Sequence, residues 1–465
     1  MPFAAFPVRR RKNASSPFES LLRVGGCSHF EGIQRMAPRI APVETSGVLP
    51  KETSVVVIGG GIVGLSAALC LAERNVPVVV VEKGRLAGEQ SSRNLGWVRK
   101  VMRSPVDLPM AQAAERLWAQ MPQRVGDDCG FRQAGIAYVS RTEKELAVHE
   151  AWLDSVKGAG VDSRMLTPGQ IADMVPGSTE HWVGGVVTPS DGRAEPTLAS
   201  SAIARAALAK GAAIVEQCAV RALTTTGGAV GGVVTERGEV RCDHVVLAGG
   251  VWSRRFLANH GVSLLTLPLV AAVLRTEPME GPADCAVGAS NFSFRKRLDG
   301  GYTITQRGAL FAPLTLDHLL IGMRYLPTLI AQWHNLRVSF GKNFFEDLAL
   351  GRRWTADSAS PFEKVRTMDP PADQGLIDEA MANLIAAWPI FAKARIAEQW
   401  GGMIDVTPDS MPVIGPVEGL PNLTLATGFS GHGFGTAPAA GELVADLVMG
   451  RSPQIDPTPY RLDRF

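Results

Sequence analysis

The sequence predicts an α/β protein in which a mostly parallel sheet with helices is interrupted by an inserted α+β domain built on an antiparallel sheet. Two observations carry this prediction. Residues 55–82 contain a β-branched run, a glycine-rich turn, a helical segment and a second β-branched run, which is the order of a strand–helix–strand unit. Residues 257–395 instead show short alternating stretches followed by longer amphipathic segments, a pattern typical of an antiparallel sheet with helices.

Composition excludes several classes of protein. A chain of 465 residues exceeds one simple core, so we expect two domains. With 46% hydrophobic and 20% charged residues it is a soluble globular protein, and a net charge of +2 gives no case for nucleic acid. No apolar run is long enough to span a membrane, since the longest, 264–274, is interrupted by Pro268. Six scattered cysteines without a CxxC, and histidines without paired spacing, argue for a reduced compartment and against a structural metal.

The first 50 residues differ from the rest in composition and lack hydrophobic periodicity. They contain the basic run 9–12, then serine, proline and glycine without periodicity, and a second methionine at Met36. Glu19, Glu31 and the lack of a long apolar core argue against a secretory signal. We interpret residues 1–50 as a disordered or targeting extension without a packed face. The expected location is cytoplasmic; peripheral membrane association is left open, and organelle targeting by residues 1–35 is disfavoured.

The turn after the first predicted strand carries the most specific motif. Gly59-x-Gly61-x-x-Gly64 follows the strand 55–58 directly and opens a helix expected over 62–73. Gly59 permits the tight turn, Gly61 lets a pyrophosphate approach the backbone, and Gly64 lets the helix pack closely on the strand. The N–H groups and dipole at the start of that helix stabilise a pyrophosphate without any lysine.

An acidic residue follows at the distance that such a motif requires. The second strand, 78–81, ends in Glu82, 18 residues after Gly64, where a carboxylate can accept both hydroxyls of an adenosine ribose. The combination predicts a Rossmann-like dinucleotide-binding domain. The motif alone does not say which dinucleotide is bound.

Helices and strands alternate up to residue 256. The sequence predicts a polar loop at 90–99, helices at 107–126, 143–157, shortly after Pro168 and at 197–210, and strands at 135–139, 219–226, 233–235, 240–242 and 244–248. The glycine-rich link 227–232 is interpreted as a hairpin turn, because no helix follows it. Gly249 and Gly250 end a central strand, where open α/β sheets hold ligands.

The inserted region is where a substrate pocket would be built. It is expected to contain strands at 269–276, 292–297 and 302–306 and long helices at 317–333 and 377–388. A strand at 423–426 and a second glycine-rich helix start at 428–438 then follow, and this start suits the anionic edge of a ring. A hydrolase elbow G-x-S-x-G around Ser430 fails, because position 432 is histidine.

Taken together, these motifs resemble the D-amino acid dehydrogenase and glycine oxidase family of FAD-dependent oxidoreductases, the DAO fold, over residues 53–450. The resemblance rests on GGGIVG at 59–64 with Glu82, Ser91-x-x-Asn94-x-Gly96, LAGGVWS at 247–253, TPDSMPVIG at 407–415 and GFSGHGFGTAP at 428–438. It implies FAD rather than NAD. The cofactor-binding residues expected on this basis are Gly59, Gly61, Ile62, Val63, Gly64, Glu82, Lys83, Ser91, Ser92, Asn94, Leu95, Gly96, Val220, Gly249, Trp252, Gly402, Gly431, His432, Gly433, Gly435 and Thr436.

The resemblance also implies a division of the chain. After the extension 1–50, residues 51–140, 186–256 and 396–465 are expected to form the three parts of the FAD-binding domain, and residues 141–185 and 257–395 the substrate domain.

The reaction implied by the resemblance is hydride transfer from a carbon bearing an amine to flavin N5, giving an imine that water hydrolyses to the oxo acid. The substrate would be a D-amino acid, a glycine-like amino acid or a secondary (imino) amino acid, with O2 or a quinone or other electron carrier as acceptor. The alternatives are oxidation of a 2-hydroxy acid, and a flavin-bearing subunit of a heteromeric opine- or sarcosine-type oxidase. Homo- or hetero-oligomers are compatible with each.

The substrate carboxylate should be bound by an arginine, whose planar fork matches it. The candidates are Arg93, Arg99, Arg307 and Arg324, and His432 joins Arg99, Arg307 and Arg324 as an expected catalytic residue. Trp97, Phe294 and Tyr302 are candidates for an apolar pocket wall.

The flavin is expected to be held non-covalently. Some related amine oxidases bind it through a cysteine five residues before the threonine of the T-x-D segment. Counted back from Thr407, that position is Gly402, and no cysteine follows Cys285.

Overall fold

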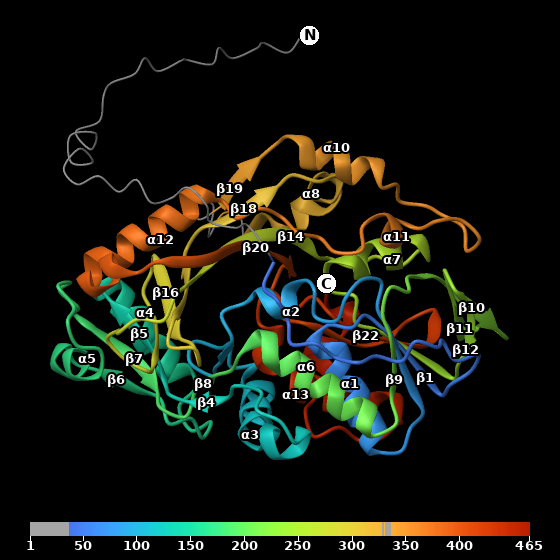
Figure 1. Ribbon diagram of the computed structural model, residues 1–465, viewed down its shortest axis with the longest axis horizontal. Helices are drawn as coiled ribbons and strands as arrows, with labels where there is room; N and C mark the ends of the chain where they lie inside the picture. Colours follow the sequence, from blue (N-terminus) through green and yellow to red (C-terminus); the bar gives the residue numbers. More distant parts are fainter. Residues whose placement is uncertain (1–36, 328–329, 331–335) are drawn as a thin grey trace, which may run out of the picture.

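The computed structural model describes residues 37–327, 330 and 336–465. Figure 1 shows two sheets with their helices, a smaller parallel sheet in the lower right of the view and a larger sheet that extends over the left and the top. Both predicted sheets are therefore present, and the candidate site lies between them.

The smaller sheet contains the predicted dinucleotide-binding unit. The strands expected at 55–58 and 78–81 and the helix expected at 62–73 are confirmed. Val55 pairs in parallel with both Val78 and His244, and the antiparallel pairs lie at one edge of the sheet. In spatial order the strands are β21 (Val413–Val417), β22 (Leu420–Thr427), β13 (His244–Leu247), β1 (Val55–Ile58), β2 (Val78–Val81) and β9 (Ala213–Val215).

Both faces of this sheet are buried, which explains its continuous valine runs. Val55 and Val57 pack in one apolar cluster, whereas Val56 packs in another on the opposite face. Helices cover the first face, namely α1 (Ile62–Glu73), α3 (Leu108–Val125), α6 (Pro196–Ala209) and α13 (Gly433–Val448). The small sheet of β10 (Val220–Thr226), β11 (Ala229–Thr235) and β12 (Gly238–Arg241) covers the second.

The larger sheet has ten strands and is mostly antiparallel, as expected for the substrate domain, but two of its strand pairs are parallel. The longest pairing joins β14 (Leu267–Thr276) to β20 (Ile396–Val406), over which Leu267 faces Val406. Its other strands are β5 (Ile136–Ser140), β6 (Arg164–Leu166), β7 (Gly184–Thr188), β15 (Ala286–Gly288), β16 (Phe292–Lys296), β17 (Tyr302–Gln306), β18 (Leu310–Pro313) and β19 (Leu336–Ser339).

Shorter elements complete the chain. A three-stranded ribbon consists of β3 (Trp97–Val98), β8 (Gly192–Arg193) and β4 (Arg132–Gln133). Further α-helices are α2 (Gln90–Arg93), α4 (Glu143–Ser155), α5 (Pro168–Met174), α7 (Ser253–Asn259), α8 (Leu316–Ile321), α10 (Lys342–Ala349), α11 (Pro361–Lys364) and α12 (Gln374–Ala387). Short 3-10 helices lie at Gly250–Trp252, Gly322–Tyr325, Pro389–Lys393, Thr458–Tyr460 and Leu462–Arg464.

The single long helix expected at 317–333 is interrupted. Helix α8 ends at Ile321 and a 3-10 turn covers Gly322–Tyr325. Gly322 lowers helix propensity at that point, and the chain is helical again at Leu326 and Pro327, where proline is tolerated in a first turn. Residues 328–329 and 331–333 of the predicted helix lie outside the described residues.

The glycine-rich link expected at 227–232 is shorter than predicted. Only Gly227 and Gly228 form the turn, with φ angles of +60° and +83°, and Thr226 pairs directly with Ala229. A two-residue turn with both residues at positive φ matches the twist of the flanking strands. Residues 229–232 therefore belong to β11.

The expectation that residues 1–50 contribute no packed face is wrong for residues 37–50. Ala41 N–H donates to the Thr197 carbonyl at 2.9 Å, and Ser201 Oγ donates to the Ala41 carbonyl at 2.7 Å. Ile40 and Val43 pack partly buried against the helical core. This stretch contributes apolar contacts and backbone hydrogen bonds to the domain, while residues 1–36 lie outside the described residues.

The large sheet crosses two of the expected domain boundaries. Strand β5 lies in it although the division assigns residues up to 140 to the FAD-binding domain, and β20 lies in it although that division begins a new part at 396. Within the described ranges, no helix has both the length and the apolar composition needed to cross a bilayer. Among the same residues, no group of three His, Cys, Asp or Glu is placed to hold a metal ion.

Candidate active site

A cavity of about 410 Å³ lies between the two sheets. Its wall begins at the glycine-rich turn between β1 and α1, continues along the segment 87–97, and ends against the strands of the large sheet. The site is therefore assembled from both domains, with one end on the parallel sheet and the other end on the substrate domain.

The glycines of the first turn have distinct structural roles. Gly59 has a φ of +110°, and a Cβ there would lie 2.5 Å from the Ala248 carbonyl oxygen. A Cβ on Gly64 would lie 2.2 Å from the Gly59 oxygen, so Gly64 provides the close helix–strand packing and is not part of the cavity wall. Gly61 does line the cavity, where a Cβ would extend to 3.1 Å from Ser91 Oγ. The space above this turn suits a phosphate chain held by backbone groups.

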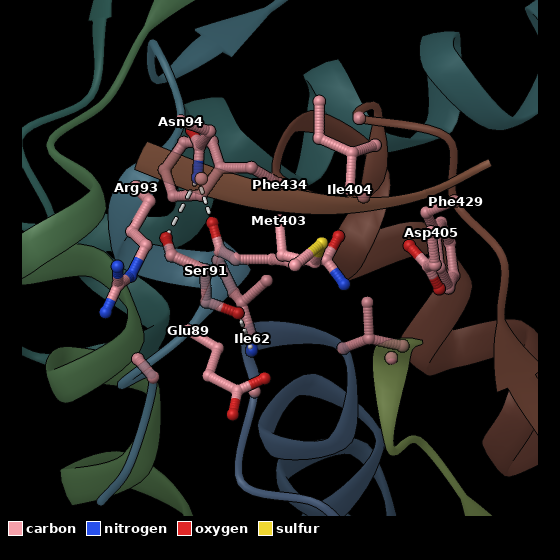
Figure 2. A pocket seen from close by; sticks show the side chains of 18 of the residues that line it. Ile62, Glu89, Ser91, Arg93, Asn94, Met403, Ile404, Asp405, Phe429 and Phe434 are labelled. Atoms are coloured by element: carbon pink, nitrogen blue, oxygen red, sulfur yellow. Dashed lines mark hydrogen bonds between the residues drawn. The ribbon is translucent and has the colours of Figure 1, made fainter. Parts of the chain in front are cut away.

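Ser91 occupies the start of α1. Its Oγ accepts the Ile62 N–H at 2.9 Å, so it satisfies one of the donors that the helix start leaves free (Figure 2). The Asn94 side chain donates to the Gln90 and Ser91 carbonyls at 3.2 and 2.9 Å and accepts the Gly96 N–H at 2.8 Å. These bonds fix the shape of the segment that borders the middle of the cavity.

Glu82 lines the cavity on the side of the parallel sheet. This is where a carboxylate that accepts the ribose hydroxyls is expected. Its two oxygens accept the Gly60 and Gly84 N–H groups, each at 2.7 Å. Burial raises the pKa of the Glu82 carboxyl, an effect that the Lys83 charge and the two backbone donors partly offset. Each oxygen keeps a lone pair for a ribose hydroxyl, because a carboxylate oxygen accepts more than one hydrogen bond.

Lys83 and Trp252 form a neighbouring part of the wall. Lys83 Nζ lies 4.4 Å from the Trp252 ring centroid and donates to Glu89 Oε1 at 2.8 Å, and Trp252 Nε1 also donates to Glu89. The Lys83 charge is thus neutralised by the protein. Both residues line the cavity, as expected, but Lys83 holds the wall together and is not a free cation.

A second helix start meets the cavity opposite the first. His432 is the N-cap of α13, and the first residues of that helix form the wall with Met403 and Ile404 of β20. Figure 2 shows the Met403 side chain extending across the space between Ser91 and Ile404. A Cβ on Gly435 would lie 2.7 Å from the Trp97 carbonyl oxygen, so glycine allows the helix to pack on the segment beside it.

Asp405 fixes the strand that carries this wall. Its Oδ2 accepts the Gly428 N–H at 2.7 Å and the Thr427 hydroxyl at 3.3 Å. Burial raises the pKa of Asp405 to about 6, although the hydrogen bonds partly offset the effect. Asp405 therefore ties β20 of the large sheet to the turn after β22 of the parallel sheet.

Arginine and aromatic side chains gather at the opposite end of the cavity. The Arg307 guanidinium lies 4.0 Å from the Tyr138 ring centroid, and Tyr138 packs edge to face on Trp97 at 5.8 Å. Arg99 donates to the Val101 carbonyl at 2.6 Å and contacts His432 Nε2 at 3.2 Å. The Trp97 indole N–H has no hydrogen-bond partner among the described residues, so an acceptor on a bound molecule would satisfy it.

His432 is neutral in this setting. Burial, and then the charges of Arg103 and Arg99, lower the pKa of its ring, which a hydrogen bond with the Ser410 backbone partly offsets. Since Arg99 can only donate, Nε2 is the accepting nitrogen and the proton lies on Nδ1. Both ring nitrogens are engaged with the protein, so His432 positions Arg99 and holds no free lone pair for proton transfer.

Most of the residues expected to bind the cofactor line this one cavity. They are Gly59, Gly61, Ile62, Val63, Glu82, Lys83, Ser91, Asn94, Leu95, Gly96, Val220, Gly249, Trp252, Gly402, Gly431, His432, Gly433 and Gly435. Ser92 and Thr436 do not line it: Ser92 Oγ bonds the Glu89 carbonyl and Thr436 Oγ1 the His432 carbonyl, so both stabilise local turns instead.

Only some of the residues expected to bind the substrate line the cavity. Arg99, Arg307 and Trp97 line the cavity, whereas Arg324 is exposed on the 3-10 turn after α8 and lies outside it. Arg93 lines the cavity but is bonded to Asp369 at 2.5 Å, and Figure 2 shows its side chain directed away from Met403.

Phe294 and Tyr302 do not line the cavity, because they are buried in the apolar core of the substrate domain. Arg103 and Tyr138 also line the cavity, although neither was predicted from the sequence, because a loop arginine and a strand tyrosine carry no local motif.

A glycine-rich turn with room for a phosphate chain, the Glu82 carboxylate and a second helix start border this one cavity, an arrangement that suits a flavin-dependent oxidoreductase. The family model described as FAD dependent oxidoreductase (DAO) matches residues 54–447, and the chain belongs to this family. The match confirms the predicted family, the FAD cofactor and the enzyme class, an FAD-dependent oxidoreductase.

Named relatives extend over nearly the whole chain. It is 26% identical to sarcosine oxidase subunit beta of Arthrobacter sp, covering 89% of this chain and 91% of that protein, and 28% identical to glycine oxidase of Pseudomonas aeruginosa, covering 87% and 97%. Among solved structures it is similar to L-amino acid deaminase from Proteus myxofaciens, with a TM-score of 0.88 and 33% identity over 93% of this chain and 98% of that one.

The residues present fit FAD. The two helix starts supply backbone donors, Gly61 leaves room for a phosphate chain, and Glu82 offers the ribose acceptor. The five described cysteines are buried and none lines the cavity. We therefore expect non-covalent binding, in which acid precipitation of the holoenzyme leaves a yellow supernatant and a colourless pellet. A yellow pellet would show a covalent linkage.

Proposed function

We propose that this protein oxidises the carbon–nitrogen bond of a carboxylate-bearing amino acid or secondary amine, such as a D-amino acid, a glycine-like amino acid or an imino acid. The observation that carries the proposal is Arg307. It lies at the substrate-domain end of the cavity, and among the described residues it forms no ion pair with a carboxylate. A substrate carboxylate would supply the missing anion through two parallel hydrogen bonds.

The protein's own part in this reaction is to bind and orient. Arg307 docks the carboxylate, and the ring face of Tyr138 holds the guanidinium in place. Trp97 and Tyr138 exclude water from the apolar side of the substrate. A bound FAD would supply the hydride acceptor. The N–H groups at the start of α13 line the cavity and would stabilise negative charge on the reduced flavin.

The reaction uses one substrate, one water and a bound flavin as the two-electron acceptor, and it releases a proton to solvent. The substrate carbon loses a hydride and its nitrogen loses a proton, so two electrons leave with the hydride and a C=N bond forms. Water then adds to the carbon, and the amine or ammonia leaves to give the oxo acid. Burial of the reacting carbon between the two domains keeps this water out until the hydride has left.

An anaerobic titration of the purified holoenzyme tests the proposal. A panel of D- and L-amino acids, N-substituted amino acids and 2-hydroxy acids would be added, and loss of flavin absorbance recorded. We expect bleaching by at least one amino or imino acid. Bleaching by 2-hydroxy acids alone would overturn the proposal, and a yellow protein that nothing reduces would favour a subunit that needs a partner for turnover.

Arg307→Met and Arg307→Lys separate docking from folding. We expect Arg307→Met to raise KM for the reactive amino acid at least 100-fold, because a charge-assisted bidentate contact is lost, while the flavin spectrum is kept. Arg307→Lys should recover part of the loss. An unchanged KM in Arg307→Met would show that the carboxylate is bound elsewhere.

A further inference from the structure

The cavity holds more positive charge than one substrate carboxylate neutralises. Six arginines line it, namely Arg85, Arg93, Arg99, Arg103, Arg307 and Arg366. Three of them form ion pairs with the protein: Arg93 with Asp369, Arg103 with Asp107, and Arg366 with Glu236. Arg85 is exposed at the end that carries the ribose carboxylate. Arg99 and Arg307 remain, both at the substrate end.

Arg99 has polar contacts but no ion-pair partner among the described residues, although its charge partly offsets the rise that burial causes in the pKa of the nearby Asp107 and Asp191 carboxyls. Its Nη1 donates to the Val101 carbonyl at 2.6 Å, and its Nη2 lies 3.2 Å from Nε2 of His432, a neutral ring. No described aspartate or glutamate forms an ion pair with it. Asp191 lies beneath the same loop, but its two oxygens accept the Lys100 and Val101 N–H groups at 2.7 and 3.0 Å.

The guanidinium charges of Arg99 and Arg307 lie close to each other at the wall of the same cavity. Burial lowers the pKa of Arg307, and the charge of Arg99 lowers it further, so the two cations are close enough to repel each other. Arg307 is held over the Tyr138 ring, Arg99 is held by His432, and both arginines line the same cavity. Two fixed cations that face one cavity are matched by a ligand with two anionic groups.

We propose that the substrate is an amino or imino dicarboxylic acid, whose carboxylate beside the reacting carbon docks on Arg307 and whose second carboxylate docks on Arg99. This inference rests on the proposed function. It deepens it by naming the substrate class: an acidic amino acid, or an amino acid whose nitrogen carries a carboxyalkyl group. The reaction is the same hydride and proton loss at the carbon–nitrogen bond, and the second carboxylate is not consumed.

A matched substrate panel tests the inference on the holoenzyme. Each dicarboxylate is paired with its half-amide: aspartate with asparagine, glutamate with glutamine in both enantiomers, and iminodiacetate with its monoamide. The rate of flavin bleaching divided by the dissociation constant is measured for each. We expect at least one dicarboxylate to exceed its half-amide more than 10-fold.

Variants assign the preference to Arg99. Arg99→Met should reduce the ratio of dicarboxylate to half-amide to below 3, Arg99→Lys should retain part of it, and the exposed Arg241→Met, which removes the same charge from the surface, should leave it unchanged. A readout without turnover uses succinate and butyrate, whose dissociation constants come from the shift of the flavin spectrum. Succinate should bind at least 10-fold more tightly to the wild type, and this advantage should be lost in Arg99→Met.

The outcomes separate the two proposals. If half-amides and dicarboxylates bleach the flavin equally well, and succinate binds no better than butyrate, the dicarboxylate inference is overturned while the proposed function stands. If no amino or imino acid bleaches the flavin, the proposed function itself fails. If Arg99→Met does not retain flavin, the wild-type panel and the succinate comparison still decide.

Discussion

Replacement of Glu82 by glutamine tests the ribose end of the site with almost no change in shape. In the structure each carboxylate oxygen accepts one backbone N–H at 2.7 Å, from Gly60 and from Gly84. Glutamine keeps one accepting oxygen and places an NH2 donor at the other position, so one of these N–H groups faces a donor. One of the two acceptors expected to bind the ribose hydroxyls is lost at the same time.

The expected loss of FAD affinity follows from the one hydrogen bond to the ribose that the substitution removes. A hydrogen bond to a charged group contributes about 1.5–3 kcal/mol, so the loss of one such bond to the ribose weakens FAD binding roughly 10- to 150-fold. The substitution should lower the folding stability of the apoprotein by less than the loss of one backbone hydrogen bond alone would. Burial raises the pKa of Glu82, which means that the folded protein opposes the charge that glutamine removes.

The assay is a titration of apoprotein with FAD, followed by the quenching of flavin fluorescence. Glu216→Gln is the matched control. Its Oε1 accepts the Leu86 N–H at 2.7 Å near the same turn, but it does not line the cavity. We expect Glu216→Gln to bind FAD like the wild type. An FAD dissociation constant for Glu82→Gln within threefold of the wild type, or an equal loss in Glu216→Gln, would refute the reasoning.

Three further predictions concern packing, docking and pH. Gly64→Ala should give little soluble holoprotein, because its Cβ would lie 2.2 Å from a backbone oxygen; yield and flavin content measure this, and normal yield would contradict it. Gly288→Ala should raise KM at least 5-fold with the fold kept, since its Cβ would lie 2.8 Å from Arg307 Nη1; steady-state kinetics and circular dichroism decide. Burial raises the pKa of Asp191 from 3.8 to about 7, so the folded chain retains a proton that the unfolded chain releases, and this contribution to stability is lost as pH rises through that window. Between pH 5 and 7 the wild type should therefore lose more unfolding free energy than Asp191→Asn, by up to about 1.4 kcal/mol per pH unit; equal slopes in urea unfolding would contradict this.

The half of the cavity expected to bind the ADP part of FAD could be predicted from the sequence, because its geometry is local. The strand, the turn and the helix of residues 55–73 are contiguous, and the space that Gly59 and Gly64 must leave empty is set by backbone within the same unit or on its neighbouring strand. Glu82 comes at the end of the next strand, so its place beside the turn follows from parallel pairing. Contacts of this kind leave a pattern in consecutive residues.

The substrate half was decided by tertiary structure alone. Arg307 and Arg324 look alike in sequence, yet the first follows β17 into the cavity and the second is exposed on a turn. Tyr138 faces Arg307 because β5 pairs in parallel with β15, across about 150 residues of chain.

Hydrophobic patterning fixes which residues are buried, but not which distant strands pair or which charges remain without partners. The sequence by itself therefore determined the family, the cofactor and the glycine-rich turn expected to bind it. Only the packing of the two sheets decided that two arginines, neither of which forms an ion pair within the described part of the chain, line one cavity, because that depends on contacts between strands far apart in the chain.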